Sequence, residues 1–419
     1  MSKDQALAAL AINGGTPACS TTWPARHLFG DAEKQAAIDL FDQSIASGTA
    51  FGYNGPEEAA YCREFADYLG GGFADAVNSG TTAVSVALRS LDLEPFTEVI
   101  VPPVSDPGGF MPVPLMGCIP VPADAAPGTY NAGAEQIAAR ITKYTSAILV
   151  AHIAGTPCDM DPIMDLASRH NLPVVEDCAQ SHGATYKGRM VGTFGEVAAF
   201  STMFGKHHAS GGQGGIVFTK SEERYRKVRW MSDRGKPFGL PAGSTNVIAA
   251  LNHNNDELGC AIGRVQLRKL PDILARRRAF VSALANEISA LKTISLIPVP
   301  ANSESAWWFL QLTLDLSKLT CDRDTFVTAL AHEGVNAGGS YLHTIIQADW
   351  YQKRRVFGTS GFPWTDPQYK GNPDALYNLP NIIATDAAHI RIMVHENCDP
   401  TLAKQTAAAL AKVEAAYSI

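Results

Sequence analysis

The stretch FSTMFGKHHASGGQGGIVFT, residues 200–219, decides how the chain folds. Before Lys206 lies a short apolar run, residues 197–201, and after it a glycine pair at 214–215 opens a second run, residues 216–219. Short apolar runs bounded by glycines are typical of buried strands. We therefore expect Lys206 to lie on a tight turn between two strands, at the rim of a sheet.

A third apolar run, upstream of this stretch, ends in two acids. Residues 173–183 read PVVEDCAQSHG, so Glu176 and Asp177 come at the C-terminal end of an expected strand. In open α/β sheets, ligands bind at this end of the strands. A lysine on a turn, an acid at a strand end and nearby glycines suit pyridoxal 5′-phosphate (PLP), which needs a lysine for its imine and a carboxylate for its pyridinium nitrogen. The residues by themselves thus favour a PLP site.

The composition is that of a large folded protein. A chain of 419 residues suggests two or three domains, and 46% hydrophobic with 18% charged residues allows a sizeable core. A net charge of −7 argues against a nucleic-acid or anionic membrane partner, for which a basic surface is expected. The 8 cysteines form no Cys-x-x-Cys pair, and neither a targeting sequence nor a membrane-length apolar run is present. We expect reduced thiols and a cytoplasmic location.

Strand and helix patterns alternate through the first two thirds of the chain, which predicts a mostly parallel sheet with helices on both faces. The expected strands cover residues 74–77, 99–102, 119–122, 146–152, 173–177, 197–201 and 216–219. The expected helices cover residues 31–46, 57–69, 81–91, 132–141 and 161–170.

The C-terminal third is expected to form a smaller α+β domain. A long helix, residues 256–283, leads into it, and it contains a strand at 307–314 and helices at 322–334 and 401–417. The N-terminal residues lack clear periodicity and read as an arm on the main body, with Trp23 and Phe29 as anchors. The predicted organisation is an arm at 1–30, a large PLP-binding domain at 31–270 and a small domain at 271–419.

These motifs resemble those of the DegT/DnrJ/EryC1/StrS family, the PLP-dependent aminotransferases of keto sugars and cyclitols. The family pattern is a strand ending in Glu-Asp-x-Ala-Gln, a Gly-x-x-Gly turn, Phe-Ser, a lysine and a Gly-Gly strand. Here it stands at residues 176–180, 192–195, 200–201, 206 and 214–215. The likeness extends from about residue 12 to about residue 277, and more weakly to the C-terminus. It implies an α/β protein of PLP-dependent transferase fold type I.

The resemblance also assigns roles near the ring of the cofactor. Lys206 would form the imine and move the proton at the substrate carbon, and Asp177 would pair with the pyridinium nitrogen. Ala179 would lie against the ring face, and Gln180 would bind the side of the ring that carries its hydroxyl group.

For the phosphate, residues 78–82 (NSGTT) follow an expected strand and open a helix, where backbone N–H groups and hydroxyls converge. The resemblance places the phosphate there, on Gly80, Thr81 and Thr82, together with Ser201. It also brings Asn252 from a neighbouring subunit, in an Asn-x-Arg-x-x-Glu motif whose arginine is Asn254 here. A homodimer with composite active sites is therefore expected.

Three features depart from the pattern or have no assigned role. The loop at residues 101–109 lacks the aromatic residue that family members often place over the cofactor, so the stacking partner is unassigned. His207 and His208 follow the lysine, but with no third ligand in sight we favour packing or substrate-side polarity over a metal site. Tyr341 and His343 are similar to a tyrosine and a histidine near the substrate entrance of the family.

The preferred hypothesis is an aminotransferase that moves an amino group from glutamate or glutamine, through pyridoxamine phosphate, to a nucleotide-linked keto sugar or a cyclitol. A sugar dehydratase is the first alternative. Relatives with that chemistry carry histidine in place of the lysine, so Lys206 counts against it and the adjacent His207 keeps it open. A non-catalytic regulatory homologue is the second, and the intact Lys206 and Asp177 disfavour it.

Overall fold

A computed structural model describes residues 2–341 and 344–419. Its centre is a seven-stranded sheet with the order β1-β9-β8-β5-β4-β2-β3. Only β9 runs antiparallel to its neighbours, so the sheet is mostly parallel, as the sequence predicts. Its strands are β1 Phe73–Val77, β2 Glu98–Val101, β3 Ile119–Pro122, β4 Thr145–Ala151, β5 Val174–Asp177, β8 Val197–Ser201 and β9 Gly215–Thr219. A separate hairpin pairs β6 Thr185–Tyr186 with β7 Arg189–Met190.

Helices cover both faces of this sheet because alternate strand residues point to opposite sides and both sides are apolar. One face packs on α4 Gly80–Arg89, α5 Pro112–Leu115 and α8 Glu222–Ser232. The other packs on α3 Pro56–Tyr68, α6 Ala134–Ala138, α7 Met160–His170 and the first half of α9 Glu257–Ile288. In β8, for example, Ala199 faces α4, and Phe200 lies in the core with α3.

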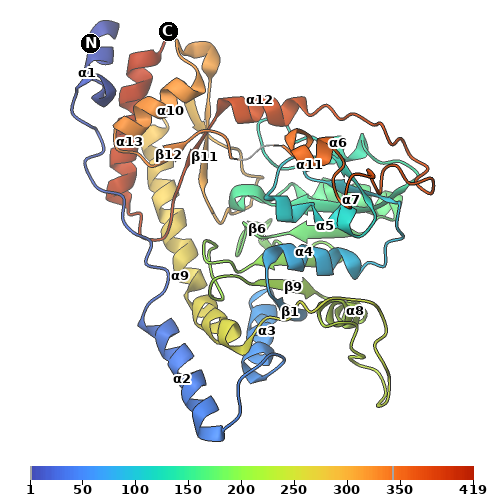
Figure 1. Cartoon of the computed structure of the whole chain (residues 1–419). Helices are drawn as coiled ribbons and strands as arrows, with labels where there is room; N and C mark the ends of the chain where they lie inside the picture. The colour runs from blue at the N-terminus through green and yellow to red at the C-terminus, as the bar shows by residue number, and fades with distance from the viewer. Residues whose placement is uncertain (1, 342–343) are drawn as a thin grey trace.

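The C-terminal part forms a second core around an antiparallel sheet with the order β10-β11-β13-β12 (Figure 1). Its strands are β10 Ile294–Leu296, β11 Leu310–Leu314, β12 Ala337–Gly338 and β13 His389–Ile392. Its helices are α10 Arg323–His332, α11 Asp349–Gln352, α12 Pro380–Ala388 and α13 Pro400–Tyr417. Short 3-10 helices lie at Ala11–Asn13, Pro107–Gly109, Ile153–Gly155, Leu316–Lys318 and Ile345–Gln347. Helix α9 contributes to both cores, so the predicted boundary at residue 270 lies inside a continuous helix and stays a prediction.

The N-terminal arm differs from the expectation. Residues Lys3–Ala9 form helix α1, whose capping box joins Ser2 and Gln5, and its Leu10 end packs in the C-terminal core beside α13 (Figure 1). Trp23 anchors the segment, because its Nε1 donates to the Gly334 carbonyl at 2.9 Å. Phe29, the second expected anchor, is 45% exposed.

Other differences concern where elements end. Strand β11 begins at Leu310 rather than at residue 307. Trp307 has a positive φ of 49°, which is not an extended conformation, so the strand cannot include it. Helix α9 runs five residues further than expected, to Ile288, whereas α6 is shorter than expected. Helix α2, Asp31–Ser47, extends from the body beside α9 (Figure 1). No helix in the described part of the chain is both long and apolar enough to cross a membrane.

Candidate active site

A pocket of about 200 Å³ lies at the C-terminal ends of β1, β5 and β8. This is the edge of an α/β sheet where ligands bind. The pocket brings together residues from four separate stretches of sequence. Those predicted from the sequence are Gly80, Thr81, Asp177, Ala179, Gln180, Ser201 and Lys206.

Among the residues that the structure describes, Lys206 is the only lysine that lines this pocket, and it is 5% exposed. Burial lowers its pKa to about 8, while the negative charges of Asp177 and Asp106 act in the opposite direction. Its Nζ lies 3.8 Å from the centroid of the Trp308 ring, so one side of the amine is covered by an aromatic face. An amine with this pKa is partly neutral near pH 7, which is the form that attacks a carbonyl carbon.

The turn that carries Lys206 is fixed by side chains from distant parts of the chain. Arg26 donates from Nη2 to the carbonyl of Lys206 at 2.6 Å, and Trp308 donates from Nε1 to that of Gly205 at 3.1 Å. Arg26 also pairs with Glu396 at 2.9 Å, and Glu396 pairs with the buried Arg277 at 3.0 Å. The N-terminal segment, helix α9 and the C-terminal part of the chain therefore all position the lysine.

Asp177 ends β5 and is 6% exposed. Burial raises its pKa, and the Ala179 N–H, which donates to its Oδ1 at 3.0 Å, and the Lys206 charge oppose the rise. A buried carboxylate with so few partners suits a cationic ring nitrogen, which would supply the missing counter-charge.

Glu176 points away from the pocket and has a structural role. Its two oxygens accept hydrogen bonds from the backbone N–H groups of Gly192, Phe194 and Gly195, each at 2.7 Å. It thereby fixes the Gly-x-x-Gly turn next to β5. Among the described residues it belongs to the one group, with His152 and Cys178, whose ligand atoms lie close enough together for a metal. Its oxygens already accept three amide hydrogens, so they are poorly placed to bind a metal ion as well.

The start of helix α4 offers a phosphate-sized cradle. Ser79 is the N-cap, and its Oγ accepts the N–H of Thr82 at 3.1 Å, while the amides of the first helical turn face the pocket end of β1. A Cβ at Gly80 would lie 2.6 Å from the Cβ of Ser201, so glycine is needed for β8 to approach this closely. Thr82 itself does not line the pocket, because its hydroxyl donates to Asn78 Oδ1 at 2.8 Å.

The loop after β2 forms another wall, against the start of α4, and residues 102–109 contain no aromatic ring. Ser105, Asp106, Gly108 and Gly109 line the pocket there. A Cβ at Gly109 would lie 2.9 Å from Asp177 Oδ2, so the backbone itself closes this side. Phe110, the next aromatic residue, is 2% exposed and packs in the core, where it stacks on Trp350. The pocket therefore has Asp106 on the loop from which an aromatic ring over the cofactor was expected by resemblance.

Gln180 and Asn252 differ in where they lie. Gln180 lines the pocket, accepts the Ala154 N–H at 2.7 Å and donates to the Tyr341 hydroxyl at 2.5 Å. Asn252 does not line the pocket of its own chain; it borders a neighbouring hollow that shares Gln213 with the pocket. His343 lies outside the described residues.

The two histidines after the lysine are fully buried and do not line the pocket. His207 faces the Ala306 carbonyl at 3.0 Å, and His208 faces the Tyr61 hydroxyl at 2.6 Å. Burial lowers the pKa of both imidazoles well below the usual range. They pack as neutral rings behind the Lys206 turn, which agrees with the packing interpretation.

These residues fit PLP. A buried amine, a buried carboxylate and a helix start are the groups that the aldehyde, the pyridine nitrogen and the phosphate of PLP require. Sequence reasoning missed Trp308 and Arg26, which lie far from the motifs, and gave no role to Asp106, which lies in the loop at residues 101–109. The sequence indicated only that Trp308 belongs to an expected strand, residues 307–314, and nothing linked it to the lysine.

The model of the DegT/DnrJ/EryC1/StrS aminotransferase family matches residues 31–375. The GDP-perosamine synthase of Caulobacter vibrioides is 33% identical over 280 residues, 66% of this chain and 73% of that protein. The L-glutamine:2-deoxy-scyllo-inosose aminotransferase of Micromonospora echinospora is 30% identical over 312 residues, 71% of this chain and 73% of that protein. The solved structure of an aminotransferase from Psychrobacter cryohalolentis covers 93% of this chain and 97% of its own, with a TM-score of 0.78 and 30% identity.

Proposed function

Since the chain belongs to the DegT/DnrJ/EryC1/StrS aminotransferase family and is a PLP-dependent aminotransferase, we propose that it transfers the amino group of L-glutamate or L-glutamine to a keto sugar or cyclitol. The observation that carries this is the position of Lys206. Its amine lines the pocket beside Asp177, while the adjacent His207 faces a carbonyl behind the turn. A dehydratase would need a histidine where Lys206 lies.

Each residue has a distinct task in this proposal. PLP, when bound, supplies an electrophilic carbon for amines and an electron-withdrawing ring. Lys206 holds the cofactor and, as a partly neutral amine, takes and returns a proton at the substrate carbon. Asp177 keeps the ring nitrogen protonated, and the first turn of α4 with Ser201 binds the phosphate. Ala179 and Gln180 complete the wall against the ring.

The acceptor is proposed at the level of its chemical class. One relative carries a GDP-linked product in its name, and the other names L-glutamine and 2-deoxy-scyllo-inosose. Both a nucleotide-linked keto sugar and a free cyclitol are therefore acceptors to test, with glutamine and glutamate as donors.

The test follows the absorbance of the bound cofactor in single turnover. L-Glutamate or L-glutamine should bleach the visible band, and a keto sugar or cyclitol should restore it. Lys206→Ala should lose both half-reactions, and His207→Gln, which changes a side chain outside the pocket, should keep the first. If neither donor bleaches the band while a hydroxylated sugar loses water at the enzyme, the dehydratase reading replaces this one.

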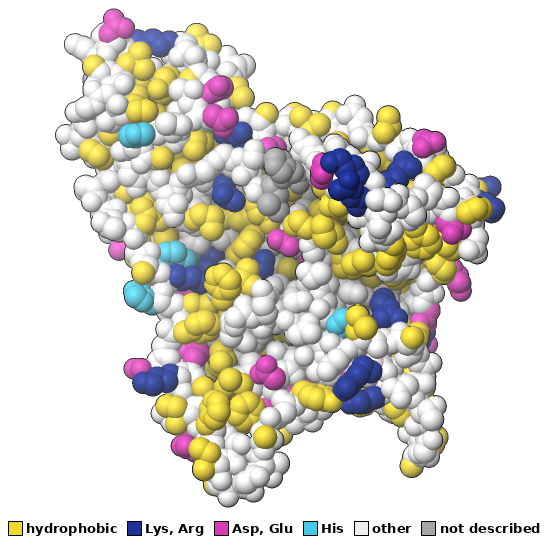
Figure 2. Space-filling model, viewed as in Figure 1, with side chains coloured by type: hydrophobic (Ala, Val, Ile, Leu, Met, Phe, Trp, Pro, Cys, Tyr) yellow, Lys and Arg dark blue, Asp and Glu magenta, His cyan; other side chains and the backbone are white. Residues whose placement is uncertain are grey.

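A homodimer with shared sites is part of the proposal. Large apolar side chains are exposed on helix α2, where hydrophobic atoms gather at the surface (Figure 2). Ile38, Phe41 and Ile45 are 39%, 50% and 76% exposed. A face of this kind favours association, and an isologous interface would present Asn252 to the partner's pocket.

Two variants distinguish loss of the dimer from loss of the contact between Asn252 and the cofactor. Phe41→Asp should give monomers by light scattering and weaken PLP binding, whereas Asn252→Ala should weaken PLP binding in an intact dimer. A monomeric wild-type protein that binds PLP tightly would refute the dimer. The cytoplasmic location stays a prediction.

A further inference from the structure

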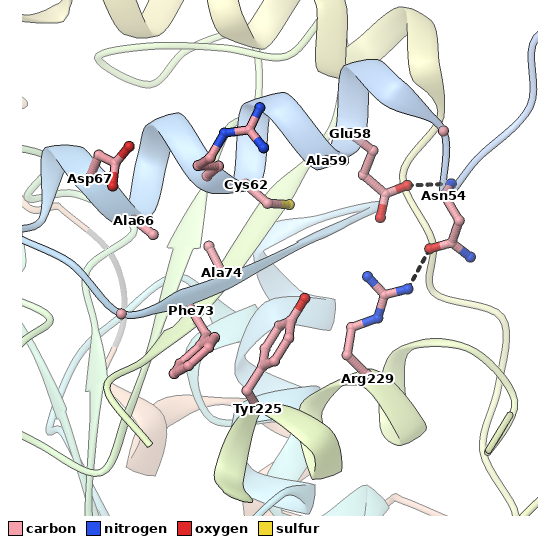
Figure 3. Close-up of a pocket in the computed structure, with 13 residues that line it drawn as sticks. Asn54, Glu58, Ala59, Cys62, Ala66, Asp67, Phe73, Ala74, Tyr225 and Arg229 are labelled. Atoms are coloured by element: carbon pink, nitrogen blue, oxygen red, sulfur yellow. Dashed lines mark hydrogen bonds between the residues drawn. The ribbon is translucent and has the colours of Figure 1, made fainter. Parts of the chain in front are cut away.

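A second pocket, of about 300 Å³, lies between helices α3 and α8 (Figure 3). We call it the α3–α8 pocket. Its floor is the start of β1, residues 72–74, whereas the cofactor pocket lies beyond the other end of the same strand. Five strand residues span roughly 17 Å, and the two pockets share no lining residue. It is therefore a separate place in the molecule.

The most buried charged residue that lines this pocket is Glu58. The residue is 2% exposed, and its side chain points from α3 towards α8 (Figure 3). One oxygen accepts the Asn54 N–H at 2.6 Å. Among the described residues Glu58 forms no ion pair and accepts no other hydrogen bond. A buried carboxylate with one neutral donor is costly unless something else pairs with it.

The nearest cation does not serve as that partner. Arg229 of α8 pairs with the buried Asp75 at 3.1 Å and donates to Asn54 Oδ1 at 2.7 Å. Arg229 is thus the one cation near two buried carboxylates, and it forms its ion pair with Asp75 rather than with Glu58. Glu257 of α9 adds a further acidic group nearby. Arg63 and Asp67 of α3 also line the pocket; both are exposed, and their opposite charges add no net charge. The charges that face Glu58 from α8, α9 and β1 therefore leave an unneutralised negative charge in the buried part of the pocket.

The remaining walls suit a small organic body. The rings of Tyr225 and Phe73 stack with centroids 5.2 Å apart and form one side, and Ala59 and Cys62 of α3 form the other (Figure 3). Such walls cover apolar atoms, while the buried carboxylate of Glu58 selects a positive charge.

We propose that the α3–α8 pocket is a second binding site, which holds a small organic ammonium compound with its charge against the Glu58 carboxylate. A metal ion fits less well, because Glu58 is the one buried carboxylate in the lining, while Asp67, the other, is exposed to solvent. The ammonium group forms a charge-assisted hydrogen bond to Glu58, and its carbon atoms lie against the Tyr225 ring. The site is independent of the aminotransferase chemistry.

The test uses the holoenzyme and a probe that cannot form an imine with PLP. N,N-Dimethylethanolamine is a tertiary ammonium ion at pH 8, and 3-methyl-1-butanol is its neutral isostere. Calorimetric titration should show one ammonium ion bound per chain and binding of the alcohol at least tenfold weaker. Glu58→Gln should lower the affinity for the ammonium ion at least tenfold. Glu222→Gln, on the exposed face of α8, should leave this affinity unchanged.

A second variant keeps the test valid if Glu58→Gln disturbs folding. Ala59→Met fills the mouth of the pocket from an exposed helical position and should abolish binding. Equal binding of the alcohol, equal binding by Glu58→Gln or Ala59→Met, or no ammonium binding at all would each overturn the proposal. In the last case the partner of Glu58 would have to be sought in a second copy of the chain.

Discussion

Lys206 should titrate near pH 8, well below an ordinary lysine, and this can be measured without the cofactor. Burial lowers its pKa from 10.5 to about 8. At pH 7.5 an amine with a pKa of 8 is about one quarter neutral, against about one part in a thousand at 10.5. Since only the neutral amine attacks a carbonyl, the structure supplies roughly a 200-fold gain in reactive lysine at this pH.

The assay is competitive acetylation of the cofactor-free protein with acetic anhydride, read by mass spectrometry from pH 6 to pH 11. Acetylation of Lys206 should rise tenfold per pH unit and level off near pH 8, while exposed lysines continue to rise. Restricted access to the pocket scales the rate but does not move the midpoint.

The perturbation that tests the cause is Asp177→Asn. The Asp177 charge raises the pKa of Lys206 against the effect of burial, so its removal should move the midpoint below that of the wild type. Ala179→Ser, which keeps all charges, is the matched control and should leave the midpoint in place. A wild-type midpoint near 10.5, or an upward shift in Asp177→Asn, would refute the reasoning.

Three further outcomes are expected. Gly80→Ala brings a Cβ to 2.6 Å from the Cβ of Ser201, so PLP affinity measured by titration should fall at least about tenfold, and unchanged affinity would refute the cradle. Glu396→Gln leaves the buried Arg277 without its counter-ion and should lower unfolding free energy by about 3 kcal/mol or more, read from denaturant midpoints; a loss below about 1 kcal/mol would contradict this. Glu58, whose pKa burial raises to about 7 from 4.5, contributes stability that is present below pH 4.5 and lost as pH rises through 7. Glu58→Gln should therefore gain up to about 3 kcal/mol relative to wild type between pH 5 and pH 8, and a constant difference would exclude the shift.

The strands and the chemistry of the cofactor pocket could be predicted because their determinants are local. Strand β8 covers the predicted residues 197–201, and Asp177 ends β5 as the motif requires. Glycine pairs, strand-end acids and apolar runs act on their immediate neighbours, so a single sequence reveals them. Thr82 was predicted to bind the phosphate, but it does not line the pocket. Ser79, Thr81 and Thr82 all carry hydroxyls at the start of the helix, and the sequence does not show that the Thr82 hydroxyl points to Asn78 instead.

Features set by tertiary contact could not be predicted in this way. Helix α1 has a local capping box at Ser2 and Gln5, which the sequence shows, but its burial depends on the C-terminal core. Trp23 and Phe29 are equally apolar in the sequence, yet only Trp23 meets a partner, the Gly334 carbonyl. Nothing within a few residues of either side chain distinguishes them.

The lysine turn shows why both kinds of information are needed. The motif identifies Lys206, but the position of its amine depends on Arg26, which is 180 residues upstream, and on Trp308, which is 103 residues downstream of the carbonyl that it binds. Neither residue belongs to a local pattern, because a side chain that donates to a backbone carbonyl imposes no requirement on the sequence beside that carbonyl. The chemistry of the site is therefore encoded by adjacent residues, and its geometry by residues that only the folded chain brings together.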